Sequence, residues 1–172
     1  MVNAIMVLNE FISLLPSNKV PEKTSGYEGF NHATSISGDV EHAHAHFILR
    51  NHDASKLETQ VNEFITIEKF LNQKYLSGKV VLTFKDQYRN MAEIIARKPM
   101  CKEHIEKIYK KLGIQYSFTP IRGGTDGATF SFLGCPCPNL GTGSYNHHGR
   151  YEFAVLEEME LLVRICTEIF KK

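Results

Sequence analysis

The stretch that decides the fold reads HAHFILRNHDASKLETQVNEFITIEKFLNQKY and spans residues 44–75. Residues 44–50 form a strand-like run, and Asp53 to Tyr75 shows the spacing of a long amphipathic helix. The side chains expected to face inward from this helix are Leu57, Val61, Phe64, Ile65, Phe70 and Leu71. A strand followed by a helix with one apolar face predicts a sheet covered by helices.

The elements around this stretch complete a first layer. Residues 1–15 have apolar side chains at helical spacing and stop at Pro16, and we expect this helix to begin without a capping residue. Residues 32–36 read as a strand, joined to residues 44–50 by a turn at Ser37-Gly38-Asp39, and residues 79–84 read as a third strand. The sequence up to about residue 96 therefore predicts an α+β layer that lacks one outer strand.

The second part of the chain alternates helices and strands, as in an α/β sheet. Helices are expected at residues 90–96, 99–112 and 155–170, with a short helical piece between Gly123-Gly124 and Gly134. Strands are expected at residues 114–119 and 137–140. We therefore predict a change of domain that leaves residues 1–96 in one domain and 97–172 in another.

Composition narrows the class of protein. The chain has 172 residues, 42% of them apolar, and a formal net charge of +1, which is typical of a globular protein and argues against a nucleic-acid partner. No run approaches the ~20 apolar residues that cross a bilayer, and the start of the chain lacks the features of a signal peptide, so no membrane association is expected. Four cysteines in a chain of this length do not resemble a disulfide scaffold, which favours a cytoplasmic protein.

Two loop clusters carry candidate chemistry. Residues 119–127 contain Arg122, Gly123, Gly124, Thr125 and Asp126 after an expected strand. The backbone N–H groups of such a turn suit an anion, but the same residues also fit a tight turn with Asp126 as an N-cap. Residues 141–152 carry two adjacent histidines, which read either as a metal ligand or as ordinary loop residues.

A third cluster is the alternating set His42, His44 and His46, which a strand would place on one face. Three imidazoles at this spacing can bind zinc, and the other interpretation is an ordinary sheet face. The Cys135-Pro136-Cys137 run is a poor chelate, since its proline is stiff and no second cysteine pair exists.

Several segments together resemble peptidase T, the aminotripeptidase branch of the dinuclear-zinc exopeptidases. They are Met1-Val2-Asn3-Ala4, residues 24–30 (TSGYEGF), Phe47-Ile48-Leu49-Arg50, Tyr88-Arg89-Asn90-Met91, residues 120–127 (PIRGGTDG), Pro136-Cys137-Pro138-Asn139 and residues 145–153. The resemblance implies an α/β catalytic domain that holds two zinc ions and a ferredoxin-like lid that also forms the dimer contact. Residues 1–96 would be the lid without its first strand, and residues 97–172 the C-terminal part of the catalytic domain.

The resemblance also implies roles for particular residues. His148 matches a metal-binding histidine, while the adjacent His147 replaces an aromatic residue. Arg50 matches a lid arginine that clamps the substrate's terminal carboxylate, a bidentate task that suits Arg. The lid residue Asn90 assists. The turn formed by Arg122, Gly123, Gly124, Thr125 and Asp126 lines the substrate pocket.

The resemblance also indicates what the chain lacks. The family's general base and its other zinc ligands precede the part matched here, so we expect a fragment that is inactive alone. The intact enzyme would release the N-terminal residue of a tripeptide with zinc-activated water. The expected partners are a tripeptide and a second copy of the chain. The alternatives are a non-catalytic module that dimerises or binds peptides, and a stand-alone metal-binding protein that uses the His42/His44/His46 strand.

Overall fold

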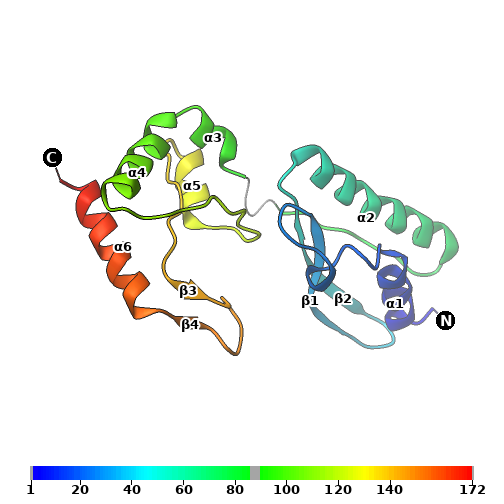
Figure 1. Ribbon diagram of the computed structural model, residues 1–172. Coiled ribbons are helices and arrows are strands. Elements are labelled where there is room, and N and C mark those ends of the chain that lie inside the picture. The colour runs from blue at the N-terminus through cyan, green and yellow to red at the C-terminus, as the bar shows by residue number, and fades with distance from the viewer. Residues whose placement is uncertain (1, 86–89, 172) are drawn as a thin grey trace. The chain divides into compact units, whose positions relative to one another are not determined.

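The computed structural model of the chain describes residues 2–85 and 90–171 (Figure 1). It divides into two compact units. The first comprises residues 1–87 and 119–123, and the second comprises residues 88–118 and 124–172. The compact units thus divide before residue 96, because residues 92–96 pack with the helices that follow them. Each unit combines helices with a small sheet, so the mixed α/β class expected from the sequence is confirmed.

The first unit is built on an antiparallel hairpin. Strand β1 (Phe30–Gly38) pairs with β2 (Ala43–Arg50), and Phe30 lies opposite Arg50 at the open end. The ladder has an irregularity between Ala33 and Ser35. The turn expected at residues 37–39 is present, and the Asp39 carboxylate closes it by accepting hydrogen bonds from two backbone N–H groups.

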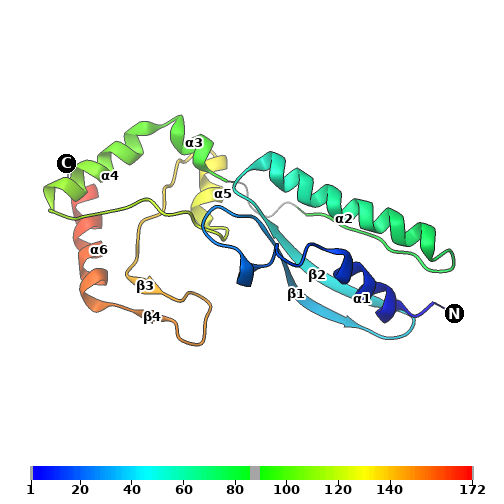
Figure 2. The ribbon, with the colours of Figure 1, turned by 45° about the vertical axis from the view of Figure 1, so that its right-hand side comes forward.

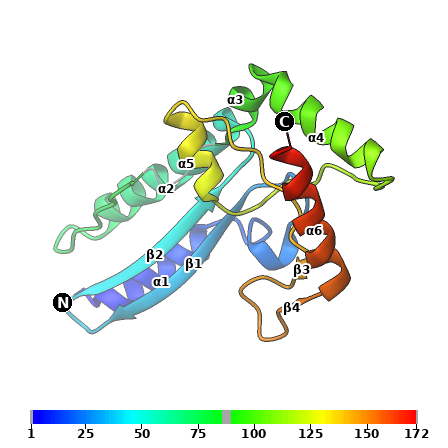
Figure 3. The ribbon, with the colours of Figure 1, turned by 90° about the vertical axis from the view of Figure 1, so that its left-hand side faces the viewer.

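Two helices cover one face of the hairpin (Figures 1 and 3). Helix α1 (Ala4–Leu14) and helix α2 (Ala54–Lys74) bring Phe11, Phe64 and Leu71 into one buried cluster. The Phe64 ring centroid lies 5.6 Å from that of Phe11 and 5.3 Å from that of Phe47 on β2. Burying aromatic rings in this way is the main source of stability in a unit of this size.

The inward face of α2 differs from the expected one. Phe70 is 47% exposed, whereas Gln60 is only 2% exposed. The buried stripe follows Gln60, Phe64, Ile67 and Leu71, which are spaced by four, three and four residues. Because Gln60 is polar, the spacing of apolar residues alone did not identify which face of α2 is buried.

The start of α1 corrects a second expectation. The helix begins at Ala4, and the Asn3 side chain caps it by accepting hydrogen bonds from the N–H groups of Ile5 and Met6. Asparagine is among the best N-cap residues, because its short side chain reaches the free N–H groups of the first turn. The expectation of an uncapped helix was therefore wrong.

Residues 79–84 do not form the third strand expected from the sequence. The Val80 N–H and C=O groups pair with the side-chain amide of Asn72, at 2.8 and 2.9 Å, and the Leu82 N–H donates to the Glu68 carboxylate at 3.1 Å. The extended segment is thus held by side chains of α2 rather than by a neighbouring strand.

The second unit is mostly helical. It contains α3 (Ala92–Ala96), α4 (Pro99–Lys111), α5 (Asp126–Phe132) and α6 (Leu156–Ile169), together with a short hairpin of β3 (Ser144–Tyr145) and β4 (Phe153–Ala154). Helix α4 packs against α6, and α3 packs against both α4 and α5 (Figure 1). Buried side chains in this unit include Ile108 of α4 and Ile165 of α6.

Two more expected strands are absent, at residues 114–119 and 137–140. In the first segment, the Tyr116 ring lies between those of Tyr109 and Phe118, with centroid distances of 4.9 and 5.7 Å. In the second, the Cys137 N–H donates to the buried Ser131 hydroxyl. Neither segment pairs with another strand among the described residues, so side-chain contacts hold them instead.

Over the described residues, none of the helices combines the length and apolar character required to cross a bilayer.

Candidate functional site

The open end of the β1–β2 hairpin gathers two candidate substrate residues of the first unit. Phe30 and Arg50 are directly opposite in the antiparallel ladder, so their side chains project from the same face. The Arg122 guanidinium carbon lies 4.7 Å from the centroid of the Phe30 ring, which is cation–π distance. Phe30 is therefore a neighbour of Arg50 in the ladder and a ring contact of Arg122, although the two arginines lie far apart in the sequence.

The fork of Arg122 is held by Thr24. One terminal nitrogen donates to the Thr24 carbonyl oxygen at 2.7 Å and the other to its Oγ1 at 2.5 Å. The Nε atom of Arg122 is buried and has no hydrogen-bond partner among the described residues. Two oxygens thus face the two terminal nitrogens, much as a carboxylate would, while one buried donor is left over.

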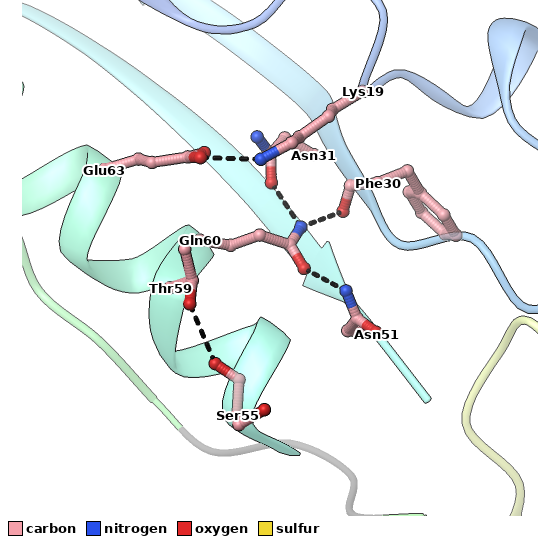
Figure 4. A network of polar contacts seen from close by, with 8 residues as sticks. All are labelled: Lys19, Phe30, Asn31, Asn51, Ser55, Thr59, Gln60 and Glu63. Carbon is pink, nitrogen blue, oxygen red and sulfur yellow. Dashed lines mark hydrogen bonds and ion pairs between the residues drawn. The ribbon is translucent and has the colours of Figure 1, made fainter. Parts of the chain in front are cut away.

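The end of β2 is fixed by a buried amide network (Figure 4). The Gln60 Nε2 donates to Asn31 Oδ1 at 2.7 Å and to the Phe30 carbonyl at 3.2 Å, and Gln60 Oε1 accepts from Asn51 Nδ2 at 2.8 Å. The Asn51 Oδ1 accepts from the N–H of Asp53 at 3.1 Å. Asn51, which directly follows Arg50, is therefore held on both sides of its amide.

The start of α2 adds a second fixed point beside Asn51. The Asp53 carboxylate accepts hydrogen bonds from the Ser55 hydroxyl, at 2.7 Å, and from the N–H groups of Ser55 and Lys56. These hydrogen bonds, that of the Ser55 hydroxyl first, hold the pKa of Asp53 below its usual value, because they favour the charged form. The capped helix fixes where β2 turns into α2.

Residues 124–126 begin α5 in the second unit. Thr125 is the N-cap residue but makes no side-chain cap, and Asp126 is the first helical residue, so the reading of Asp126 as an N-cap was wrong. A Cβ at Gly127 would come 2.7 Å from the Cys137 carbonyl oxygen, so only glycine allows this close approach. Gly123 belongs to the first unit together with Arg122.

The other lid candidate, Asn90, lies at the start of α3. Its side-chain oxygen accepts from the N–H of Ala92 at 2.9 Å, so the amide helps to begin the helix. Tyr88 and Arg89 precede Asn90 in the segment 88–91, which resembles peptidase T, and they lie outside the described residues.

The two adjacent histidines follow β3 and differ in their contacts. The His147 Nε2 is 2.7 Å from Ser144 Oγ, whereas the His148 ring has no hydrogen bond to any other described residue. His148 is exposed and has a φ of 64°, and its N–H donates to the Glu152 carboxylate at 3.2 Å. Each histidine thus keeps at least one ring nitrogen without a hydrogen bond to another described residue.

The alternating histidines of the first unit do not form a shared site. His42 lies in the turn before β2, while His44 and His46 lie on the strand. The His44 Nε2 is 2.8 Å from Ser37 Oγ and the His46 Nδ1 is 2.7 Å from Thr34 Oγ1. The rings of His44 and His46 are thus paired with hydroxyl groups across the hairpin, which agrees with the interpretation of this strand as an ordinary sheet face.

No three side chains of His, Cys, Asp or Glu gather at metal-binding geometry anywhere in residues 2–85 and 90–171. A catalytic zinc ion takes three protein ligands and a structural one takes four. The described residues therefore do not fit a complete zinc site, and His148 offers one ligand at most.

Thr24, Phe30 and His32, which lie at or near Arg122, were not predicted as individual site residues from the sequence. Thr24 and Phe30 are the first and last residues of the segment 24–30, which resembles peptidase T. This resemblance was the feature of the sequence that could have identified them. His32 shares the face of Phe30 and lies opposite Ile48 on β2, so it adds a half-buried imidazole to this part of the sheet.

Several known proteins are similar to this chain. Residues 1–79 match the profile of the peptidase dimerisation domain of the M20 family. Peptidase T of Clostridium perfringens is 47% identical over 99% of this chain and 42% of its own length, and peptidase T of Staphylococcus saprophyticus is 39% identical over 98% and 41%. This chain is similar to part of peptidase T.

The peptidase T likeness extends to the fold. A tripeptidase from Staphylococcus aureus superposes with a TM-score of 0.68, covering 99% of this chain and 45% of that one, at 22% identity. An aminopeptidase PepT from Bacillus cereus superposes with a TM-score of 0.59 at 20% identity, covering 99% and 46%. The chain thus spans under half the length of the peptidase T relatives that it matches.

Proposed function

We propose that this chain supplies the dimerisation lid and the terminal-carboxylate subsite of a zinc-dependent, cytoplasmic aminotripeptidase. One observation carries the proposal: the Arg122 guanidinium lies over the ring of Phe30, and Phe30 lies opposite Arg50 in the ladder at one end of the sheet. Two arginines on one face suit a carboxylate, because each guanidinium offers parallel N–H donors.

The chemistry of this subsite is recognition rather than bond cleavage. The carboxylate of a tripeptide would take the place of the two Thr24 oxygens on the Arg122 fork, with one oxygen on each terminal nitrogen. The amide network around Gln60 supports the arrangement by fixing Asn51, the neighbour of Arg50. Glycines 123 and 124 with Thr125 and Asp126 would continue the lining of the pocket in the family enzyme.

Binding of a tripeptide is the direct test. We expect trialanine to bind more tightly than its C-terminal amide, as measured by calorimetry. Arg122→Lys should weaken trialanine at least tenfold, or about 1.4 kcal/mol, because lysine cannot make the bidentate contact. Arg164→Lys, at an exposed arginine of α6, is the matched control and should bind as the parent does. Equal affinity for the acid and the amide would contradict the proposed subsite.

Zinc is the cofactor that we propose for the family reaction, with His148 as the contribution of this chain. Because the described donor set does not complete a zinc site, we expect the isolated chain not to hydrolyse tripeptides with or without added zinc. Release of the N-terminal alanine of trialanine, followed by amine labelling, is the assay. Zinc-dependent release by the purified chain would refute this part of the proposal.

A non-catalytic dimerising module is the second candidate, and the match of residues 1–79 to the peptidase dimerisation domain favours it. Analytical ultracentrifugation distinguishes this role from the first. A dimer that binds neither trialanine nor its amide would support the module alone. A strictly monomeric chain at all concentrations would exclude it.

A further inference from the structure

A basic hollow of about 310 Å³ lies between α4 and α6 of the second unit. Figure 2 shows the last turns of α4 beside the C-terminal end of α6. Both helices belong to the same compact unit, so the hollow lies within that unit. The residues that line it are His104, Lys107, Ile108 and Lys111 of α4 and Glu168 and Lys171 of α6.

The basic side chains share one face of α4. His104, Lys107 and Lys111 are spaced by three and four residues, which places neighbouring side chains on the same side of a helix. Ile108 lies among them and is only 5% exposed, so this side of α4 packs against α6 through an apolar contact. The long lysine side chains extend past this contact and carry their charged ends to the solvent.

Glu168 fixes two of the three lysines. Its Oε2 accepts a hydrogen bond from Lys111 Nζ at 2.5 Å, and its Oε1 accepts one from Lys171 Nζ. The Glu168 side chain is only 12% exposed, whereas the side chains of Lys111 and Lys171 are 65% and 60% exposed. One carboxylate therefore holds two ammonium groups in place, and each ammonium keeps further N–H donors for a ligand.

The hollow carries more positive charge than its carboxylate balances. Lys107 also lines it and has no hydrogen bond or ion pair with any other described residue. Three ammonium groups and one carboxylate thus leave an excess of two positive charges. A dianion would neutralise this excess. Because Lys111 and Lys171 are already held by Glu168, a ligand would lose less side-chain entropy on binding them.

A phosphate monoester has the chemistry that this hollow requires. It carries nearly two negative charges at neutral pH and offers three strong acceptor oxygens, and lysine is a common partner of phosphate. An extended polyanion fits less well, because acidic side chains such as Glu103 and Glu106 follow the same helix and the whole chain has a net charge of only +1. The volume of the hollow is at the lower end of the range for small-molecule sites.

We propose that the α4–α6 hollow binds a small phosphate monoester through Lys107, Lys111 and Lys171. The phosphate oxygens accept hydrogen bonds from the three ammonium groups, and the ester group lies toward His104 and Ile108. This site is separate from the peptide subsite around Arg122, which belongs to the first unit. It therefore gives the chain a second ligand, with a chemistry unrelated to peptide cleavage.

The test is calorimetric titration of the full chain with phenyl phosphate near neutral pH. Phenyl sulfate is the matched control ligand, because it has the same shape and one negative charge fewer. We expect saturable one-to-one binding of phenyl phosphate, and binding of phenyl sulfate that is weaker by about fivefold or more. An oligothymidylate without terminal phosphates should bind more weakly than phenyl phosphate. If it binds more tightly, the surface recognises nucleic acid and the proposal is overturned.

Two matched variants locate the site. Lys107→Gln removes one charge from the hollow, whereas Lys110→Gln removes the same charge from an exposed position of the same helix outside it. Neither lysine has an ion pair with another described residue, so both variants should fold as the parent does, which circular dichroism checks. We expect Lys107→Gln to weaken phenyl phosphate by about fivefold or more, and Lys110→Gln to change its affinity by less than about twofold.

Three outcomes would overturn the proposal. They are no binding of phenyl phosphate, equal affinity for phenyl phosphate and phenyl sulfate, and equal loss of affinity in the Lys107→Gln and Lys110→Gln variants. Nuclear magnetic resonance gives an independent check on the place of binding. Phenyl phosphate should shift the amide signals of residues 104–111 and 168–171, and shifts confined to other residues would also refute the assignment.

Discussion

Replacing Gln60 with leucine tests the amide network directly. The Gln60 side chain is 2% exposed and makes three hydrogen bonds, to Asn31, Phe30 and Asn51. Leucine has a similar volume but no polar atom, so the change removes the bonds and keeps the packing of α2 on the sheet. Asn31 is 4% exposed and its Nδ2 already lacks a partner, so its Oδ1 would be left buried and unpaired.

The magnitude follows from the burial of the three partners. Leaving the Asn31 oxygen buried without a donor costs about 1–3 kcal/mol, and the half-exposed Phe30 carbonyl and Asn51 amide add about 0.5 kcal/mol each, since water reaches them. The total is roughly 2–4 kcal/mol, a large share of the ~5–15 kcal/mol that stabilises a typical domain. For a unit of this size, the melting temperature should fall by on the order of 10–30 °C.

The assay is thermal and urea unfolding followed by circular dichroism. Gln73→Leu, at an exposed position of the same helix, is the control and should change the stability by less than about 0.5 kcal/mol. Combining Asn31→Leu with Gln60→Leu should recover part of the loss, because the unpaired oxygen is then gone. If Gln60→Leu and Gln73→Leu unfold alike, the network contributes nothing and the reasoning is refuted.

Three other changes have expected outcomes. Asn3→Ala should cost about 1 kcal/mol in thermal unfolding, since it removes the cap of α1, and an unchanged melting temperature would contradict that role. Ser131→Ala should cost about 1–3 kcal/mol, because the Cys137 N–H loses its acceptor, and Ser131→Cys, which keeps a weak acceptor, should cost less. Hydrogen bonds from Lys111 and Lys171 lower the pKa of Glu168 from its ordinary 4.5 to about 2. Its contribution is therefore complete above pH 4.5 and is lost as the pH falls toward 2, so Glu168→Gln should flatten the acid limb of a stability–pH curve, and an unchanged limb would refute the assignment.

The helices could be predicted from the sequence because their signals are local. The apolar spacing before Pro16, the long run that ends at Tyr75 and the start at Pro99 each lie within one element. The three failed strands show the opposite case. Residues 79–84, 114–119 and 137–140 have strand-like composition, but a strand forms only where another strand lies beside it, and no pattern within a segment reports that.

The candidate site shows the same limit. Arg122 could be singled out from its glycine-rich surroundings, but its contact with Thr24 joins residues 98 positions apart. The burial of Gln60 was also beyond the sequence, because a polar side chain is buried only where partners such as Asn31 and Asn51 converge on it. The residue types were enough to suggest that Arg122 binds an anion, but the hydrogen-bond partners of Arg122 and Gln60 could be identified only from the folded structure.

Because the first unit includes residues 119–123, the order of synthesis matters for its assembly. The hairpin and both of its helices leave the ribosome before Arg122 is translated. At about 5–20 residues per second, residues 88–123 take roughly 2–7 s to make. During that interval Thr24 and the Phe30 ring lack their contact with the Arg122 guanidinium. Chaperones and proteases therefore encounter a first unit that does not yet contain residues 119–123.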